Sequence, residues 1–358
     1  MTKKSSRYLP LVHHFGKFIS LSASGRRLTP SGRRLSKGAI IQYQCIFKLL
    51  RDYETTVARQ ALRIKLLHRS SLRELQSEKL YWQRFFRQFT TWLYGEKKYY
   101  DQYVGSVAKV LRTFFNWLLN EKALPIGNFH KQFRIPGQKI TPVVLEPQQL
   151  NFLITNTGFH DSLPSYLQRT KDIFVFGCTV GLRYGDLRKL RKQDIQYTAN
   201  DTYVLINTSK TSTEVKIPLP GYALDIIHKY DRKTGKYLLP RLSGTNLNLQ
   251  LKSIMERAGW VYSLPKLRCR QGKPIELKNK EGECFRFCDH ITAHTMRRTA
   301  ITTLLLLGVE ETMVRRISGH APGSKEFYKY VAVVQDYLND KVKIAHRKLL
   351  EINTKNTG

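Results

Sequence analysis

The second half of the sequence carries a set of residues suited to chemistry at a phosphate. In chain order the set is Arg183, Lys210, His294, Arg297, His320, Tyr328 and Tyr330. In-line displacement at a phosphodiester needs positive charge on the non-bridging oxygens, a nucleophile, and a proton for the departing alkoxide. Arginine suits the first task because its planar guanidinium stays charged. Lysine, histidine and tyrosine are residue types that can supply the nucleophile and the proton.

Two short motifs carry the arginines. In the first, Arg183 follows Gly181 at an expected helix start, and Asp186 three residues later can hold the guanidinium toward a phosphate. In the second, His294 and Arg297 stand three residues apart, so both project from one face of a first helical turn. Each motif alone is a weak signal. The first pattern also fits an ordinary surface ion pair, and the second also fits a histidine buried in the core.

A glycine-histidine pair at 319–320, followed by the two tyrosines, makes the pattern specific. The order Arg, Lys, His-x-x-Arg, Gly-His, Tyr resembles the tyrosine recombinase (phage integrase) family. The resemblance implies that the two arginines bind the non-bridging oxygens of the scissile phosphate. It also implies that Lys210 is the general acid for the leaving 5′ oxygen and that both histidines complete the pocket. In the family a tyrosine attacks the phosphorus and forms a 3′-phosphotyrosyl link.

The choice of nucleophile lies between two tyrosines. Tyr328 and Tyr330 are separated by about 200° around a helix, so only one of them can face the pocket. Tyr330 shares the apolar side with Phe327 and Val334, and family members often show Phe-x-x-Tyr followed by Ile or Val. The spacing from His320 is ten residues to Tyr330 and eight to Tyr328, on either side of the family's usual nine. We predict Tyr330 as the nucleophile, with Tyr328 as the second choice.

The charge balance indicates a polyanionic partner. The chain has 61 Lys and Arg against 27 Asp and Glu, a formal net charge of +34. Such a charge, interleaved with aromatic residues, favours double-stranded DNA as the partner. A membrane surface is the competing interpretation, but no stretch approaches the ~20 apolar residues that a spanning helix needs. We also find no secretory signal, and we expect a cytoplasmic, nucleoid-associated protein of a prokaryote.

The cysteines and carboxylates favour chemistry without a metal or other cofactor. The five cysteines are Cys45, Cys178, Cys269, Cys284 and Cys288. Their odd number and scatter argue against a disulfide framework. Three of them lie near His290, but the spacing lacks a C-x2-C pair, so we interpret them as thiols and not as a zinc site. No carboxylate cluster suited to Mg²⁺ stands near the candidate catalytic residues, and the family conserves bond energy in the phosphotyrosine, so ligation needs no ATP.

The elements that must position these residues fall into two domains joined by a linker. Residues 1–40 lack acidic residues and predict a basic flexible arm. Residues 41–126 carry apolar stripes at helical spacing, which the resemblance identifies as a core-binding (SAM-like) DNA-binding domain. Residues 127–144, with their glycines and prolines, form the linker. The catalytic domain covers 145–334, and 335–358 form a C-terminal tail helix.

The catalytic domain is expected to be mainly α with a small β-sheet (α+β). A helix covers 172–179, and the segments 202–207 and 214–218 alternate as two strands whose polar turn presents the candidate lysine. Two further helices cover 292–307 and 310–318, each ended by a glycine.

The predicted function is site-specific recombination for the integration and excision of a mobile element. In the family the tail helix docks on a neighbouring protomer, which implies a homotetramer on paired DNA sites, with accessory DNA-bending proteins as further partners. One alternative is a type IB topoisomerase, which shares the chemistry but relaxes supercoils. A second alternative is a DNA-binding regulator that kept the fold and lost the activity.

Overall fold

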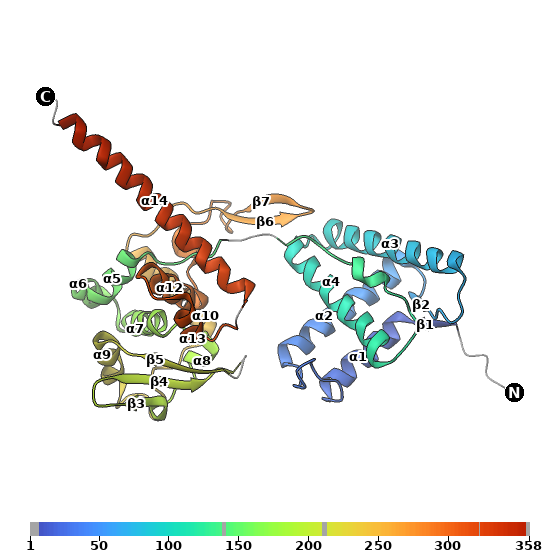
Figure 1. The fold of residues 1–358 in the computed structure, drawn as a ribbon, viewed down its shortest axis with the longest axis horizontal. Coiled ribbons are helices and arrows are strands. Elements are labelled where there is room, and N and C mark those ends of the chain that lie inside the picture. The colour runs from blue at the N-terminus through green and yellow to red at the C-terminus, as the bar shows by residue number, and fades with distance from the viewer. Residues whose placement is uncertain (1–6, 138–140, 210–212, 322, 356–358) are drawn as a thin grey trace. The chain divides into compact units, whose positions relative to one another are not determined.

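The chain folds into two units that are both rich in helices. The computed structural model describes residues 7–137, 141–209, 213–321 and 323–355. One unit combines residues 1–139 with 267–277, and the other combines 140–266 with 278–358. Figure 1 shows small sheets beside the helices of each unit. The predicted class, mainly α with small β-sheets, is confirmed.

The first unit is held together by an aromatic core. Its elements are β1 (Tyr8–Pro10), α1 (Leu11–Ala23), α2 (Lys37–Tyr53), the π-helix η1 (Glu54–Ala58), β2 (Arg63–Lys65), α3 (Leu72–Gly95), α4 (Asp101–Asn116), the π-helix η2 (Trp117–Glu121) and the 3-10 helix η3 (Phe129–Gln132). The ring centroid of Phe18 lies 5.6 Å from that of Phe114 and 5.4 Å from that of Trp117. Such pairs add about 0.5–1.5 kcal/mol each beyond the area that they bury.

The prediction of a flexible arm over residues 1–40 is wrong for the described part of that segment. Strand β1 pairs with β2, and α1 buries Leu11, Phe15 and Phe18 completely. These three residues stand at positions i, i+4 and i+7, so they share one helical face. The basic, glycine-rich composition of the segment is typical of a flexible arm, but this apolar stripe supplies part of the core.

The second unit places a three-stranded antiparallel sheet beside a set of helices. Its elements are α5 (Pro147–Thr155), α6 (Thr157–Ser162), α7 (Ser165–Val180), α8 (Tyr184–Leu187), the 3-10 helix η4 (Lys192–Asp194), β3 (Ile195–Tyr197), β4 (Thr202–Asn207), β5 (Glu214–Pro218), α9 (Gly221–Tyr230), α10 (Gly244–Arg257), α11 (Phe287–His290), α12 (Ala293–Leu306), α13 (Glu311–Ser318) and α14 (Lys325–Lys355). The sheet order is β3-β4-β5, and Val204 pairs with Ile217 in the predicted hairpin. Both side chains are buried, which fixes the register.

The centre of the second unit is the packing of α7 on α12. Residues on both helices are buried, among them Phe174, Phe176, Met296 and Ala300. A Cβ atom at Gly177 would overlap the sulfur of Met296. The glycine therefore lets the two helices approach closely, and it brings the chain segments after α7 and at the start of α12 together.

The last two helices follow the predicted pattern except at one boundary. Helix α13 ends at Gly319, whose φ of 61° suits a glycine after a helix end. Helix α14 is one continuous helix over Lys325–Lys355. It crosses residues 334 and 335 without a break, so the predicted division between catalytic domain and tail helix is not a structural boundary. No helix in the described ranges is both long and apolar enough to span a membrane.

A hairpin from the second half of the chain belongs to the first unit. It consists of β6 (Lys266–Arg270) and β7 (Lys273–Leu277), and it was not predicted from the sequence. Gln271 and Gly272 have φ values of 54° and 77°, as a tight type I′ hairpin turn requires. Their backbone N–H groups donate to the carboxylate of Asp101 at 2.8 and 2.9 Å. Because Asp101 is only 5% exposed, these charge-assisted bonds anchor the turn at the start of α4.

Two arginines of β6 extend this contact along the first unit. The guanidinium of Arg270 lies 4.8 Å from the ring centroid of Tyr100 and donates to the carbonyl of Lys98 at 2.8 Å. Arg268 donates to the side chain of Gln102 at 3.0 Å. The hairpin is therefore attached to the first unit through backbone, cation–π and side-chain contacts together.

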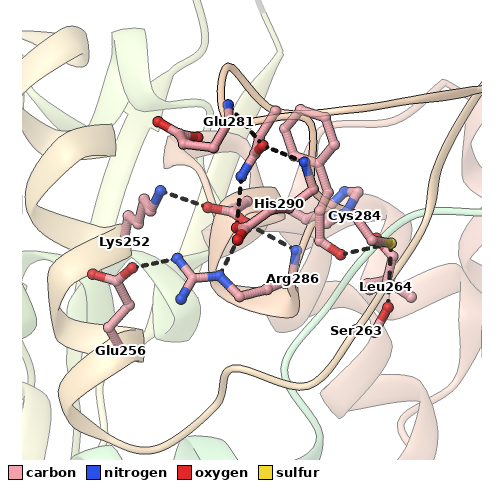
Figure 2. A network of polar contacts seen from close by, with 12 residues as sticks. Lys252, Glu256, Ser263, Leu264, Glu281, Cys284, Arg286 and His290 are labelled. Atoms are coloured by element: carbon pink, nitrogen blue, oxygen red, sulfur yellow. Dashed lines mark hydrogen bonds and ion pairs between the residues drawn. The ribbon is translucent and has the colours of Figure 1, made fainter.

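The chain that follows the hairpin is fixed within the second unit by a network of polar contacts (Figure 2). Arg286 contacts Glu256 at 2.6 Å, and Lys252 contacts Asp289 at 2.7 Å. Asp289 also accepts a hydrogen bond from the backbone N–H of Arg286 at 2.8 Å. Because Lys252 and Glu256 lie one turn apart on α10, the network fastens the start of α11 to that helix.

Replacing Asp101 with alanine should release the hairpin turn from the first unit. We expect the free energy of unfolding to fall by about 1.5–3 kcal/mol, the range for hydrogen bonds to charged groups. Hydrogen exchange should show faster exchange at the amides of Gln271 and Gly272. Gln102→Ala, which removes an exposed contact of the same hairpin, is the matched control. Unchanged amide protection in the Asp101 variant would contradict the anchoring role.

Candidate active site

Two arginines from separate elements meet where α7 ends. Gly181 ends α7 with a φ of 62° and turns the chain so that Arg183 stands at the start of α8. Arg297 reaches the same place from α12, is 2% exposed, and donates through Nη1 to the carbonyl of Gly181 at 3.0 Å. Burial and then the charge of Arg183 lower the pKa of Arg297 to about 10. The two guanidinium groups therefore lie near enough to repel each other.

Arg183 keeps a nitrogen without a partner. Its Nη1 atom is buried and has no hydrogen-bond partner among the residues that the structure describes. Leaving a buried charged donor unpaired costs free energy, because the group has lost its hydrogen bonds to water and has no acceptor to replace them. An oxyanion beside Arg183 and Arg297 would pair this donor and reduce the repulsion.

His320 contacts the buried arginine directly. Its ring nitrogens Nδ1 and Nε2 lie 3.2 and 3.1 Å from Nη2 of Arg297. Burial and the charges of Arg297, Arg183 and Arg315 lower the pKa of His320 to about 3. The imidazole is therefore neutral at neutral pH while no anion is bound.

His294 stands in the first turn of α12, one turn before Arg297. Burial and the charges of Arg298, Arg297 and Arg183 lower its pKa to about 4. The side chain is nevertheless among the exposed ones, so solvent weakens this effect compared with His320. The structure thus brings both predicted histidines to the arginine pair, one half-buried and one at the surface.

The structure separates the two candidate tyrosines by burial and by contact. Tyr330 is 5% exposed, its side chain interacts electrostatically with Arg297, and its ring centroid lies 6.0 Å from that of His320. Tyr328 is 51% exposed, and the guanidinium carbon of Arg315 lies 4.9 Å from the ring centroid of Tyr328. Only Tyr330 therefore joins the arginine and histidine side chains.

Lys210 lies outside the described residues, but its neighbour Ser209 is held beside the site. Asp186, which the sequence suggested as a partner for Arg183, accepts a hydrogen bond from the backbone N–H of Ser209 at 3.1 Å. Asp186 is 6% exposed, so this contact fixes the end of β4 against α8. The carboxylate positions a loop, a role that sequence spacing alone did not indicate.

A cavity of about 390 Å³ opens beside Arg183. Its lining includes Arg183, Asp186, Ser209 and two exposed cations, Arg188 and Lys189. Sequence reasoning missed these two, although they follow Arg183 within one short segment. The cavity is an open, positively charged recess of a kind that suits a phosphate backbone.

The described residues contain no group of three or more His, Cys, Asp or Glu side chains arranged to hold a metal. Cys288, one of the thiols near His290, is fully buried, and His290 bonds through Nε2 to the carbonyl of Leu264 at 2.8 Å (Figure 2). The sulfur of Cys284 accepts a hydrogen bond from Ser263 at 3.2 Å. These side chains are thus engaged in packing and hydrogen bonding.

Comparisons with known proteins match one family model and several solved structures. A family model described as "Phage integrase family" matches residues 144–335. The fold is similar to that of the XerH site-specific recombinase bound to a palindromic difH substrate, with a TM-score of 0.60, 14% identity, and coverage of 94% of this chain and 96% of that one. It is also similar to the Tn1549 transposon integrase in complex with circular intermediate DNA, with a TM-score of 0.56, 13% identity, and coverage of 90% and 95%.

A third similar structure is a lambda integrase tetramer bound to a Holliday junction, with a TM-score of 0.52, 15% identity, and coverage of 88% of this chain and 79% of that one. No curated protein sequence matches the chain. The low identities show that the likeness lies in the fold, whereas the family model covers more than half of the sequence. The chain therefore belongs to the phage integrase family and is a tyrosine site-specific recombinase.

Proposed function

We propose that this recombinase cleaves each DNA strand by attack of the Tyr330 phenol oxygen on the scissile phosphorus. The new bond joins the tyrosine oxygen to phosphorus, and the bond between phosphorus and the 5′ oxygen breaks. The observation that carries the proposal is the unpaired Nη1 of Arg183 beside Arg297 and the buried Tyr330. These side chains provide an anion site and a nucleophile in one place.

Each side chain has a role that follows from its chemistry. The two arginines neutralise the non-bridging oxygens, where negative charge grows during displacement. Arg297 is oriented for this task by Gly181 and His320, and His294 adds a further hydrogen-bonding group at the rim. Lys210, whose role comes from the family resemblance, protonates the leaving 5′ oxygen. The free 5′ hydroxyl of another strand then attacks the 3′-phosphotyrosyl link and regenerates the tyrosine.

The substrate is double-stranded DNA carrying paired recombination sites. Support comes from the charge of +34 and from relatives solved with DNA. The related lambda integrase forms a tetramer on a Holliday junction, and we propose a homotetramer here, with the end of α14 docking on a neighbouring protomer. Helices of residues 41–126 contact DNA as a core-binding domain.

We propose that the reaction integrates and excises a mobile element at the nucleoid of a prokaryotic cell, with the help of accessory DNA-bending proteins. The relative from transposon Tn1549, whose complex contains circular intermediate DNA, supports the link to a mobile element. A type IB topoisomerase and a silent DNA-binding regulator are less favoured than a recombinase, because the family and the similar structures are recombinases and integrases. Sequence-independent relaxation of plasmid DNA would favour the topoisomerase.

The nucleophile is tested by covalent trapping on nicked DNA. A pool of nicked duplexes with randomised sequence around the nick is incubated with the protein, and adducts are isolated under denaturing conditions. We expect adducts with the wild type and with Tyr328→Phe, and none with Tyr330→Phe, because Tyr330 is the buried tyrosine that interacts with Arg297. Sequencing the captured DNA also gives the preferred site. Adducts that persist in Tyr330→Phe and vanish in Tyr328→Phe would reverse the assignment.

The anion site is tested by removing the unpaired guanidinium. With the selected DNA at saturation, Arg183→Ala should reduce the rate of adduct formation roughly 10²- to 10³-fold, the usual loss for one oxyanion-stabilising donor. The exposed Arg232→Ala in the same unit serves as a charge-matched control. Equal rates for the two variants would show that Arg183 does not act on the phosphate.

The neutral His320 predicts how stability depends on pH in the DNA-free protein. Its pKa in the folded chain, about 3, lies below the unfolded value near 6.5, so below pH ~6.5 the unfolded state binds more protons. The stability that it contributes is therefore present at neutral pH and is lost as pH falls from ~6.5 toward ~3. His320→Gln should lose less stability between pH 7 and pH 4.5, measured by urea unfolding. The exposed His228→Gln is the control, and matching slopes in all three proteins would contradict the prediction.

A further inference from the structure

Ser318 is a buried hydroxyl beside the active site that the proposed reaction does not use. It is the last residue of α13 and is 1% exposed. Its Oγ atom lies 2.6 Å from the carbonyl oxygen of Val314, 3.3 Å from that of Arg315, and 2.8 Å from Nδ1 of His320. One hydroxyl therefore contacts two main-chain acceptors and a ring nitrogen.

The hydrogen of this hydroxyl can be assigned from its partners. A serine hydroxyl has one hydrogen to donate and two lone pairs to accept with, whereas a carbonyl oxygen can only accept. The contact to Val314 is the shortest, so the hydrogen points to that carbonyl. The contact between Ser318 and His320 is then a hydrogen bond in which Nδ1–H of the ring donates to the serine oxygen.

Arg297 also contacts the same ring. A guanidinium has donors only, so it can bond only to a ring nitrogen that has a free lone pair. Its Nη2 lies 3.1 Å from Nε2 of His320 and slightly farther, 3.2 Å, from Nδ1. A neutral imidazole carries one N–H, and placing it on Nδ1 leaves the lone pair of Nε2 for Arg297. The tautomer that Ser318 selects therefore also leaves an acceptor for Arg297.

The remaining surroundings hold the ring in place and favour its neutral form. The backbone N–H of His320 donates to the carbonyl of Arg315 at 3.0 Å. The charged and titratable groups that face the ring are Arg183 before α8, His294 and Arg297 on α12, Arg315 on α13 and Tyr330 on α14. Their cationic members oppose protonation, so the ring is neutral before an anion binds.

We propose that Ser318 is a positioning residue that holds His320 as the Nδ1–H tautomer and thereby orients Arg297 toward the scissile phosphate. The donors then run in one direction, from Arg297 to Nε2, from Nδ1–H to Ser318, and from the serine hydroxyl to Val314. Hydrogen bonds in such a chain strengthen one another. The other guanidinium nitrogen, Nη1, is held by Gly181, so the plane of Arg297 is fixed from two sides.

This inference rests on the proposed function, because it gives Ser318 a role through residues assigned to the phosphate site. It also contains a claim that does not depend on activity, namely the position of one proton on His320. The tautomer can be measured in the DNA-free full-length chain. A failure of the inference and a failure of the proposed function are therefore distinguishable.

The tautomer is tested by nitrogen NMR of protein labelled with ¹⁵N-histidine, with His320 assigned by the signal that is missing in His320→Gln. We expect the pattern of a neutral ring protonated at Nδ1 in the wild type and in Ser318→Thr. Ser318→Ala and Ser318→Cys should lose this preference, because a methyl group cannot accept a hydrogen bond and a thiol accepts one only weakly. A wild-type ring protonated at Nε2, or an unchanged tautomer in Ser318→Ala, would overturn the proposal.

The kinetic test uses the adduct assay with DNA at saturation. Ser318→Ala and Ser318→Cys should lower the cleavage rate roughly 10- to 100-fold, as for other partners that orient an active-site group, with little change in DNA affinity. Cysteine keeps the volume of the side chain, so a loss shared with alanine comes from the hydrogen bond, and threonine should restore most of the rate. If the wild type forms adducts and all three variants match it, the positioning role is wrong. If the wild type forms none, the proposed function fails while the NMR result still decides the tautomer.

Discussion

Arg183 and Arg297 place two like charges close together, and the rest of the site is arranged around their repulsion. Arg297 already donates to Gly181 and contacts His320, whereas Arg183 keeps a buried Nη1 that has no partner in the described chain. A phosphate oxygen would supply the missing acceptor and relieve the repulsion together. Folding supplies the energy that holds the two arginines close together, so the site is organised before DNA arrives.

The packing of α7 on α12 is what makes this arrangement possible. Each large apolar side chain that is fully buried stabilises the fold by about 1.5–3 kcal/mol. The burial of Phe174, Phe176 and Met296 therefore offsets a substantial part of the repulsion between the two arginines. Gly177 permits the close approach of the helices, and Gly181 turns the chain directly after α7. The two arginines lie close together because one follows the end of α7 and the other lies in the second turn of α12.

Much of the second unit could be predicted from the sequence, because its signals are local. The β4–β5 hairpin and the helix ends at glycines follow from spacing over a few residues. The grouping of Arg183 with the His-x-x-Arg segment came from the resemblance to the tyrosine recombinase family. The structure brings Arg183, His294, Arg297, His320 and Tyr330 together, while Lys210 stays outside the described residues.

What could not be predicted depends on contacts between distant parts of the chain. Helix α1 was not predicted, because the basic, glycine-rich composition of residues 1–40 is typical of a flexible arm. Its apolar residues nevertheless face the core of the first unit. The docking of the β6–β7 turn on Asp101 joins residues 170 positions apart, for which a single sequence has no local signal. The contact of Ser318 with His320 is local in sequence. The role proposed for it could not be predicted locally, because it depends on the contact of His320 with Arg297 from another helix.

The most direct test of this account is the structure of the covalent complex trapped on DNA. The account predicts a bond between phosphorus and the Tyr330 oxygen, with nitrogens of both Arg183 and Arg297 about 2.7–3.2 Å from the non-bridging oxygens. The Nη1 of Arg183 that is unpaired in the DNA-free chain should be one of these donors. A phosphorus bonded to another side chain, or a phosphate that leaves Arg183 unpaired, would contradict it.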